Sequence, residues 1–410
     1  MPTNKVIEEH ESCRIVMDMK PSVGISRNKC IVCKGRIMCG ISPCPILSSI
    51  SIDFRENVDN KWSLQGRASG VNVGWEKFPS GSIVPTILDN EYDPSIKFDN
   101  IRESIYYKIS NIYGPCIEGS HIDRYENELS KIALSQDPIE LDVSFSGRPE
   151  RRFFFSTVER AYANSGPIEA LEVFGEPNIP LFFIDILERN MAYEQAIIEA
   201  YRNDAEIEYI SKLLSMGCFG KTQKFMPSRW AKTTVYSVCS HHMIKNIKKL
   251  PIGQQTSLYH HRHLGNDYVV LAFPRAWEFE LLERWLPNCI WTMGEDTPLY
   301  LHEHETYNGV SDQAMREGGS YYSSRLGVCE LLKREGMQSA CLVISSANPG
   351  SSIPFGSGET RMGVSGAELI DRYDDEGEAL EEACSIIGMP KKTLFRNSML
   401  LSQNTLGRWL

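Results

Sequence analysis

Four cysteines near the N-terminus restrict the fold of this chain more than any other feature of its sequence. They form the pattern C-x2-C-x5-C-x4-C, in which the cysteines are Cys30, Cys33, Cys39 and Cys44. Four thiolates at this spacing can complete the tetrahedral shell of a zinc ion, and a shell closed by four sulfurs leaves no position for water. The pattern therefore predicts a structural Zn²⁺ site within a small module at residues 29–48.

Two alternatives for this cysteine cluster stay open. An iron–sulfur cluster takes the same ligands, and four cysteines can also be buried in a core without any metal. The chain contains 12 cysteines, and the others show no comparable spacing. Because the cysteines are spread through a long polypeptide rather than a short secreted one, we do not expect a disulfide framework.

The C-terminus carries a second pattern, Q-x-x-L-x-x-W-L, formed by Gln403, Leu406, Trp409 and Leu410. A single 3₁₀ turn would bring the three apolar side chains to one face and leave the glutamine at the edge of that face. This layout is typical of peptides that dock into the DNA sliding clamp, so the sequence predicts the clamp (PCNA) as a partner. The alternative is that Leu406 and Trp409 pack on the protein's own core.

The composition is that of a folded protein whose contacts with nucleic acid must be local. Apolar residues make up 42% of the chain and charged residues 23%, without any low-complexity tract. The formal charge of −10 does not attract the whole molecule to DNA. The basic residues that are candidates for nucleic-acid contact are Lys221, Lys224, Arg229 and Lys232. A solvated helix surface explains such a run equally well.

The sequence contains no predicted membrane segment. No apolar run approaches the roughly 18 residues that a membrane span requires, and the N-terminus lacks the layout of a signal peptide. We therefore expect a cytoplasmic protein that has no membrane partner and associates with the nucleoid when it is bound to the clamp.

The spacing of apolar residues predicts a mixed α/β fold of the α+β class. Helical periodicity is present at residues 125–135, 192–202, 207–214 and 321–334. The pattern of strands is present at residues 139–145, 268–273 and 340–344. Both kinds of element alternate along the chain, which excludes a purely helical and a purely β protein.

Three expectations concern the C-terminal half of the chain. Residues 277–286 follow a strand and a proline and are expected to form a helix. Residues 345–366 are rich in glycine, serine and proline and are expected to form a long loop. Residues 366–387 are expected to form an acidic helix, and the chain beyond Gly388 a polar tail.

These segments predict one large body with small modules at its ends. The expected divisions are an N-terminal arm at residues 1–28, the zinc module at 29–48, the body at 49–388 and a flexible tail at 389–410. A subdivision of the body near residues 175–190 is an option that the sequence leaves open.

Two further segments contain side chains suited to a site. Arg229 and Trp230 stand at an expected helix start, where backbone N–H groups, a guanidinium and an aromatic plane suit a phosphate or nucleotide. His302 and His304 would share one face of a strand, as two ligands of a catalytic metal do. A helix cap with a packed tryptophan, and exposed strand histidines, explain the same residues without a site.

The chain resembles the archaeal Nre family of DNA repair proteins over nearly its full length. The segments that carry the resemblance are Pro45-Ile46-Leu47 after the cysteine cluster, Val71-Asn72-Val73-Gly74, Leu214-Ser215-x-Gly217-x-x-Gly220, Pro227-x-Arg229-Trp230, Gly265-Asn266, Trp277-x-Phe279-Glu280 and Gly318-Gly319-x-Tyr321-Tyr322-x-x-Arg325-Leu326. The resemblance implies an N-terminal zinc motif, a clamp-binding box at the C-terminus and a link to repair of DNA damage. By position it implies the same four cysteines as zinc ligands and the same four C-terminal residues as the clamp box.

This chain also departs from the family's pattern. It has Ser228 where the family has threonine, and Tyr236 or Ser237 where the family has an acidic residue. If those acids are catalytic in relatives, this chain lacks the activity.

Two hypotheses of different kinds follow. The first is a clamp-recruited enzyme that acts on DNA or a nucleotide, with Arg229, Trp230, Arg325, His302 and His304 lining its site. The second is a non-catalytic adaptor that binds DNA or a repair partner while its tail holds the clamp. The sequence alone does not decide whether the protein is an enzyme. Convergence of Arg229, Arg325 and the histidines in one pocket would favour the first hypothesis, and their separation would argue against it.

Overall fold

The computed structural model describes residues 13–17, 28–34, 40, 41, 46, 50–54, 61–74, 82–96, 107–154, 156, 158–219, 224–310, 319–349, 351 and 356–402. The chain contains both helices and strands, so the α+β class is confirmed. It divides into two compact units, Met1–Ile25 with Gly35–Val235 (unit 1) and Ser26–Lys34 with Tyr236–Leu410 (unit 2). The division of the body therefore falls between Val235 and Tyr236, whereas the sequence offered a subdivision near residues 175–190.

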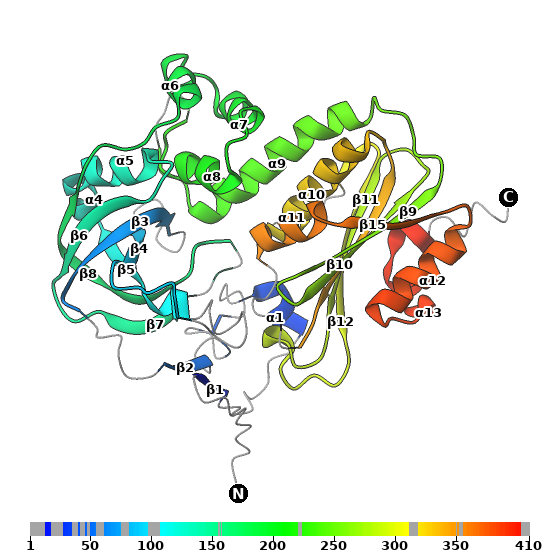
Figure 1. The fold of residues 1–410 in the computed structure, drawn as a ribbon, viewed down its shortest axis with the longest axis horizontal. Helices are drawn as coiled ribbons and strands as arrows, with labels where there is room; N and C mark the ends of the chain where they lie inside the picture. Colours follow the sequence, from blue (N-terminus) through cyan, green and yellow to red (C-terminus); the bar gives the residue numbers. More distant parts are fainter. Residues whose placement is uncertain are drawn as a thin grey trace, which may run out of the picture. The chain divides into compact units, whose positions relative to one another are not determined.

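Unit 1 is built around a β-sheet that closes on itself (Figure 1). Its strands are β3 (Ser63–Val73), β4 (Ser82–Asp89), β5 (Ile112–Glu118), β6 (Ile139–Phe145), β7 (Glu150–Phe154) and β8 (Tyr162–Val173). They lie in the order β5-β4-β3-β6-β8-β7, and β8 also pairs with β5 in parallel. The extra pairing closes five strands into a barrel, which removes the free edges of the sheet.

The connections of this barrel are those of an OB-fold. The first three strands form a meander, the last strand runs parallel to the third, and helices α4 (Ser120–Arg124) and α5 (Glu126–Leu134) lie between the third and fourth strands. Strand β6 covers the same residues, 139–145, as the strand predicted from alternation, and its burial alternates residue by residue. The inward residues, among them Leu141, Val143 and Ile87, form a continuous core.

Three helices follow the barrel and complete unit 1. They are α6 (Leu181–Glu188), α7 (Tyr193–Arg202) and α8 (Ile207–Ser215). Helix α8 joins α5 through Lys212, whose Nζ donates to the main-chain oxygens of Ile132 and Ser135 at 3.0 and 2.6 Å. Burial, reinforced by the charge of Arg160, lowers the pKa of Lys212 to about 7. The lysine therefore satisfies carbonyl groups at the end of α5 that helix geometry leaves without a partner.

Unit 2 contains a seven-stranded mixed sheet. Its strands are β9 (Thr256–His263), β10 (Asn266–Phe273), β11 (Glu278–Trp285), β12 (Leu299–Thr306), β13 (Gly309–Val310), β14 (Ala340–Ala347) and β15 (Glu368–Tyr373). The order is β13-β12-β11-β14-β10-β9-β15, and only β11 and β14 run parallel within this order. Strand β14 occupies the centre, and all of its residues are buried.

Helices cover both faces of this sheet (Figure 1). Helices α10 (Gly319–Glu335) and α11 (Ser357–Ser365) lie on one face, and α12 (Glu376–Ile387) and α13 (Lys391–Asn397) on the other. The long helix α9 (Ser228–Ile247) contributes its C-terminal half to unit 2, and a 3₁₀ turn at Ile290–Thr292 follows β11. Because both faces are covered, β10 and β14 consist of nearly continuous apolar runs.

One predicted helix is wrong. Residues 278–285, expected to be helical, form β11, which pairs with β12 and β14. Its sequence, EFELLERW, mixes charged and apolar residues, and the adjacent Leu281 and Leu282 break the alternation that marks a half-buried strand. The cross-strand partners decided the outcome, and they are 14 to 62 residues distant along the chain.

The predictions for the C-terminal region need three corrections. The expected long loop at residues 345–366 contains the end of β14 and helix α11, and the expected acidic helix at 366–387 is strand β15 followed by α12. Gly388 ends α12 with a φ of 59°, a left-handed conformation that glycine adopts without strain. The chain then continues as α13 instead of a polar tail, and Leu394, Leu400 and Leu401 are buried in the core.

The N-terminal region is described only in part. Strands β1 (Cys13–Met17) and β2 (Ile50–Phe54) form a separate antiparallel pair, and helix α1 (Asn28–Cys33) belongs to unit 2. None of the helices in the described ranges is both long and apolar enough to cross a bilayer.

Candidate functional site

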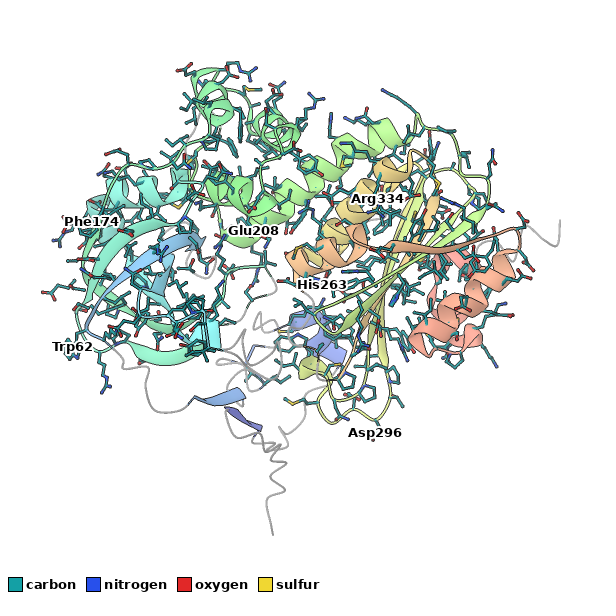
Figure 2. All side chains as sticks on the ribbon, viewed as in Figure 1. Trp62, Phe174, Glu208, His263, Asp296 and Arg334 are labelled. Carbon is teal, nitrogen blue, oxygen red and sulfur yellow. The ribbon has the colours of Figure 1, made fainter. Side chains whose placement is uncertain are left out.

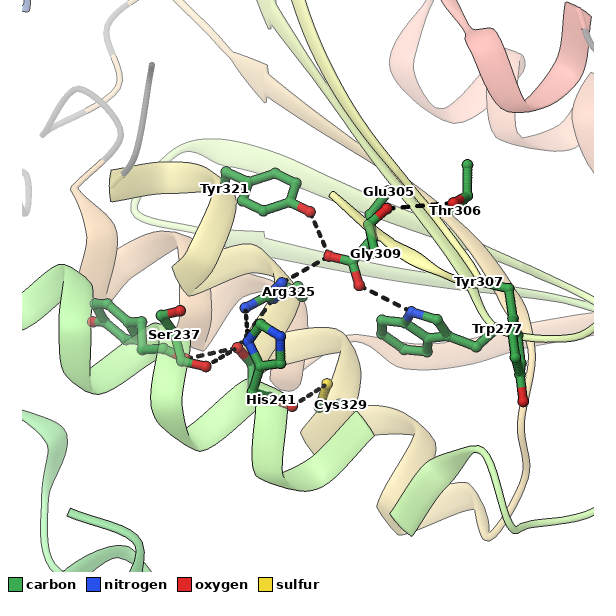
Figure 3. Close-up of polar contacts among 12 residues, drawn as sticks. Ser237, His241, Trp277, Glu305, Thr306, Tyr307, Gly309, Tyr321, Arg325 and Cys329 are labelled. Atoms are coloured by element: carbon green, nitrogen blue, oxygen red, sulfur yellow. Dashed lines mark hydrogen bonds and ion pairs between the residues drawn. The ribbon is translucent and has the colours of Figure 1, made fainter. Parts of the chain in front are cut away.

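A group of buried polar side chains lies on the α10 face of the seven-stranded sheet (Figure 3). Glu305 of β12 accepts hydrogen bonds from Tyr321 Oη at 2.6 Å, Arg325 Nη1 at 2.7 Å and Trp277 Nε1 at 3.2 Å. Arg325 is fully buried and donates from Nε to Ser240 Oγ at 3.1 Å. These contacts connect β12, α10 and α9 through one ion pair.

Charge within this group is balanced. Burial by itself raises the pKa of Glu305, but the charge of Arg325 and the hydrogen bonds from Tyr321, Arg325 and Trp277 outweigh it, so the pKa lies below its usual value. Burial and the same arginine lower the pKa of His241, whose Nδ1 lies 3.3 Å from Arg325 Nη2. Because Arg325 can only donate, His241 Nδ1 is the acceptor and the proton of the neutral ring is on Nε2.

A second buried carboxylate lies on the same face of the sheet. Lys34 Nζ donates to the two carboxylate oxygens of Glu283 at 3.1 and 2.9 Å and to Ser320 Oγ of α10 at 3.1 Å. Trp285 Nε1 donates to Glu283 at 3.2 Å, and its ring lies 5.1 Å from the same ammonium. Lys34 directly follows α1, so this ion pair joins the segment that carries Cys30 and Cys33 to the sheet.

Glu283 belongs to a line of polar side chains at the carboxyl ends of β11 and β14. Tyr268 of β10, Ser345 of β14 and Glu283 of β11 are direct cross-strand partners. Such partners share a face of the sheet, and here it is the face that α10 and α11 cover. We call these three residues the polar row. In the rows below it on this face, the residues of β10, β11 and β14 are apolar, for example Val343 and Leu281.

The loop that leaves β14 is fixed to the neighbouring hairpin. Asn348 donates to Gly265 O at 2.9 Å and to Asp267 Oδ2 at 2.6 Å, and His260 Nε2 lies 3.0 Å from Asp267 Oδ1. Gly265 has a φ of 82°, and a Cβ there would lie 3.2 Å from the backbone of Ser351. The polar row therefore lies beside the loop after β14, and hydrogen bonds to the β9–β10 hairpin fix the beginning of this loop.

The structure does not bring the predicted residues of unit 2 together. Arg325 bonds to Glu305 on the α10 face, whereas His304 lies on the opposite face, with its Nε2 2.7 Å from Glu278 Oε1. His302, also on the opposite face, is exposed. The alternation predicted for this strand is correct, but the sheet separates the histidines from the arginine.

The predicted residues of unit 1 surround the first turn of α9. Arg229 lies 3.7 Å from the buried carboxylate of Glu159, and Lys232 pairs with Glu208 at 2.6 Å. Trp230 is 50% exposed. Lys224 is also exposed, and Lys221 lies outside the described residues. Ser228 Oγ accepts a hydrogen bond from the main chain of Val73 at 2.8 Å, so the residue before the arginine joins α9 to the barrel.

The predicted zinc and clamp motifs fall largely outside the described residues. Cys30 is half-buried and Cys33 is buried, and both lie on α1. Cys39 and Cys44, as well as Gln403, Leu406, Trp409 and Leu410, are outside the described part of the chain. Within the ranges that are described, no group of three or more histidine, cysteine or acidic side chains is placed to hold a metal.

The outer face of the barrel does not offer the surface at which OB-folds bind oligonucleotides, which is formed by the second and third strands. Val84 and Thr86, which point outward on β4, are only 6% and 2% exposed. A Cβ on Gly70 would collide with the side chain of Arg160, and one on Gly114 with the ring of Tyr162. Side chains just before and within β8 thus cover part of this face.

Sequence reasoning missed the polar row and both buried carboxylates. Glu305 was visible as the last residue of the His-Glu-His-Glu alternation, and Ser345 as a polar residue at the end of an apolar strand. Neither signal identifies a partner, because Lys34 is 249 residues from Glu283 along the chain. Only the sheet register places these residues side by side.

We predict that Arg325→Met destabilises the protein strongly because it leaves Glu305 buried without its cation. The expected loss is about 3–5 kcal/mol of unfolding free energy, measured by chemical denaturation. Lys333→Met on the same helix removes an exposed cation and should change stability by less than about 0.5 kcal/mol. Equal effects of the two substitutions would show that the ion pair does not hold α10 on the sheet.

Comparison with known proteins identifies the family. Residues 38–292 match the family described as "Archaeal Nre, N-terminal", and residues 305–409 match "Archaeal Nre, C-terminal". The chain is 27% identical to the DNA repair protein NreB of Archaeoglobus fulgidus over 337 residues, which are 80% of this chain and 84% of the relative.

Two further relatives are DNA repair proteins called NreA. The one from Archaeoglobus fulgidus is 25% identical, with 85% of this chain and 91% of the relative covered, and the one from Haloferax volcanii is 23% identical, with 85% and 88% covered. No match was found among solved structures. The two family matches together cover most of the sequence, and the chain belongs to the archaeal Nre family.

Proposed function

We propose that this protein acts in DNA repair and is recruited to its site of action by the DNA sliding clamp. The observation that supports the repair role is the match to relatives named DNA repair proteins over 80–85% of this chain. The clamp-binding pattern at Gln403, Leu406, Trp409 and Leu410 supports the recruitment. Recruitment and DNA contact do not require a catalysed reaction, so both are compatible with an enzyme and with an adaptor.

The segment before the C-terminal pattern is anchored to unit 2. Buried Glu280 accepts hydrogen bonds from Ser398 Oγ at 2.7 Å, Met399 N at 2.8 Å and Leu400 N at 2.9 Å. It therefore caps the helical turn at residues 399–402, a position where a carboxylate also benefits from the helix dipole. A motif that begins at Gln403 directly follows this anchor, which supports its use for attachment to a partner.

A structural zinc ion at the four cysteines is the second part of the proposal. Cys30 and Cys33 are three residues apart on α1 and therefore lie on the same side of the helix, as two ligands of one ion must. Lys34, with a φ of 45°, ends α1 in a left-handed conformation. A zinc ion held by Cys30, Cys33, Cys39 and Cys44 would cross-link this segment and perform no chemistry.

Contact with DNA is the third part, and the first turn of α9 supports it best. Trp230 and Phe225 are 50% and 38% exposed, and Lys224 beside them is exposed. Aromatic side chains that stack on bases, together with a nearby cation, are typical of surfaces that bind single strands. Arg229 and Lys232 lie next to this surface but already pair with carboxylates.

We predict that Trp409→Ala abolishes most of the affinity for the sliding clamp. In a calorimetric titration the intact protein should bind the clamp with a dissociation constant of about 1 μM. Loss of the aromatic anchor should weaken this binding roughly 30-fold or more. Met399→Ala, an exposed residue before the motif, should leave the affinity unchanged. Clamp binding that survives Trp409→Ala would disprove recruitment by this motif.

We predict about one zinc ion per chain in the purified protein, measured by elemental analysis. Cys30→Ser should lower the zinc content and the melting temperature together, because the ion cross-links the segment. Cys116→Ser, a change outside the cluster, should affect neither. Iron with acid-labile sulfide, or a metal-free protein that is equally stable, would refute the zinc proposal.

We predict that Trp230→Ala weakens binding to single-stranded DNA about tenfold, since one stacked base contributes about 1–3 kcal/mol. Fluorescence anisotropy with a labelled oligonucleotide measures this. Trp62→Ala is the matched control because Trp62 is another exposed tryptophan of unit 1, at 61%. The same loss in both variants, or in neither, would exclude the α9 surface as the DNA contact.

A further inference from the structure

Three buried hydroxyl groups around the polar row have no hydrogen-bond partner among the residues that the structure describes. They are the Oγ atoms of Ser345, Ser324 and Ser357, and these residues are 1%, 0% and 3% exposed. A buried hydroxyl without a partner costs about 1–3 kcal/mol, and several of them around one place call for an explanation such as a bound group.

These hydroxyls lie near the adjacent ends of two helices. Arg361 of α11 pairs with Glu330 of α10 at 2.7 Å, and Arg334 near the end of α10 donates to Ser365 O and Ala367 O at the end of α11. Later residues of α10 thus contact later residues of α11, which means that the two helices run parallel. Their N-terminal ends lie together, and Arg334, labelled in Figure 2, is near their C-terminal ends.

Both N-terminal ends lie over the polar row. Ser320 in the first turn of α10 is joined to Glu283 by Lys34. Tyr268 lies beneath α11: a Cβ on Gly363, near the end of that helix, would collide with its ring, and burial together with the charge of Glu359 in the first turn raises the pKa of its hydroxyl. Ser345 is the residue of the row between Tyr268 and Glu283, so its side chain lies between theirs on the face that α10 and α11 cover.

The charges at this place favour a negatively charged ligand. Each helix carries roughly half a positive charge at its N-terminus, and parallel neighbours bring two such charges together. The N-cap residue of α11 is Gly356, which has no side chain with which to cap the helix. The carboxylate of Glu283 is neutralised by Lys34, and the carboxylate of Glu359 lies against Gly356, where a Cβ would collide with it. Glu359 is thus the negative charge at the start of α11.

We infer that the paired N-termini of α10 and α11, with the hydroxyls of Ser345, Ser324 and Ser357, form a binding site for a phosphate monoester. Its oxygens accept hydrogen bonds from these hydroxyls and from the first backbone N–H groups of the helices, and Glu359 moves aside. Phosphate groups bind at helix N-termini and outside the carboxyl ends of strands for the same electrostatic reason. A free nucleotide and the 5′ end of a DNA strand both carry this group.

The site goes beyond the proposed recruitment function and does not depend on it, because unit 2 alone supplies the residues. The test uses the full-length protein without the clamp. Calorimetric titrations with dAMP, and with one oligonucleotide carrying either a 5′ phosphate or a 5′ hydroxyl, determine whether the phosphate monoester is bound and which source is preferred. A loss of clamp binding would not change these results.

Three variants make the test specific. Ser345→Ala should weaken binding of dAMP or the 5′-phosphorylated strand about tenfold, the effect of one lost hydrogen bond to a charged group. Glu359→Gln should tighten it roughly threefold because a competing negative charge is removed. Ser339→Ala is the matched control: Ser339 is also buried in unit 2, near the start of β14, with an Oγ that lacks a partner among the described residues.

The outcomes separate the possibilities. Both Ser345→Ala and Ser339→Ala remove a buried hydroxyl that has no partner in the described part of the chain, so both proteins should fold with unchanged or higher melting temperature. Weaker binding in the first and unchanged binding in the second supports the site. Three results would overturn the proposed site: no binding of any phosphorylated probe, equal binding of the 5′-hydroxyl strand, or equal effects of the two serine substitutions. Ordered water would then be the hydrogen-bond partner of the buried hydroxyls.

Discussion

Buried carboxylates on the seven-stranded sheet determine how the rest of unit 2 is attached to it. Glu305 pairs with Arg325 of α10, which also bonds to α9. Glu283 pairs with Lys34 at the end of α1, and Glu280 accepts hydrogen bonds from the last described turn of the chain. A carboxylate in a core is costly unless it is paired or fully hydrogen-bonded. Each of these residues therefore fixes one partner segment at one place, which apolar packing alone does not do.

Two of these anchors lie next to the motifs that the sequence singled out. Lys34 follows the first two cysteines of the cluster, and the turn that Glu280 caps ends just before the C-terminal pattern. A zinc ion and a clamp peptide would thus both act on segments that are already attached to the same sheet.

The residues that the sequence suggested as catalytic have mostly structural partners. Arg325 forms an ion pair with Glu305, His304 contacts Glu278, and Arg229 lies within ion-pair distance of Glu159. The hydroxyls around the polar row are different, because they are buried and have no partner within the described residues. Unsatisfied polar groups, rather than paired charges, indicate where a ligand belongs, and three of those in unit 2 belong to the polar row and to the two helices that cover it.

The sequence by itself determined the fold class, the family, the positions of helices α5, α7, α8 and α10, and strands such as β6, whose alternation is a local property. It also located the cysteine cluster and the C-terminal pattern, since both are short motifs. Tertiary structure decided that residues 278–285 form β11, that α11 interrupts the expected loop and that α13 replaces the tail. It also assembled the polar row, because cross-strand register and the parallel placement of two helices depend on partners far apart in the chain.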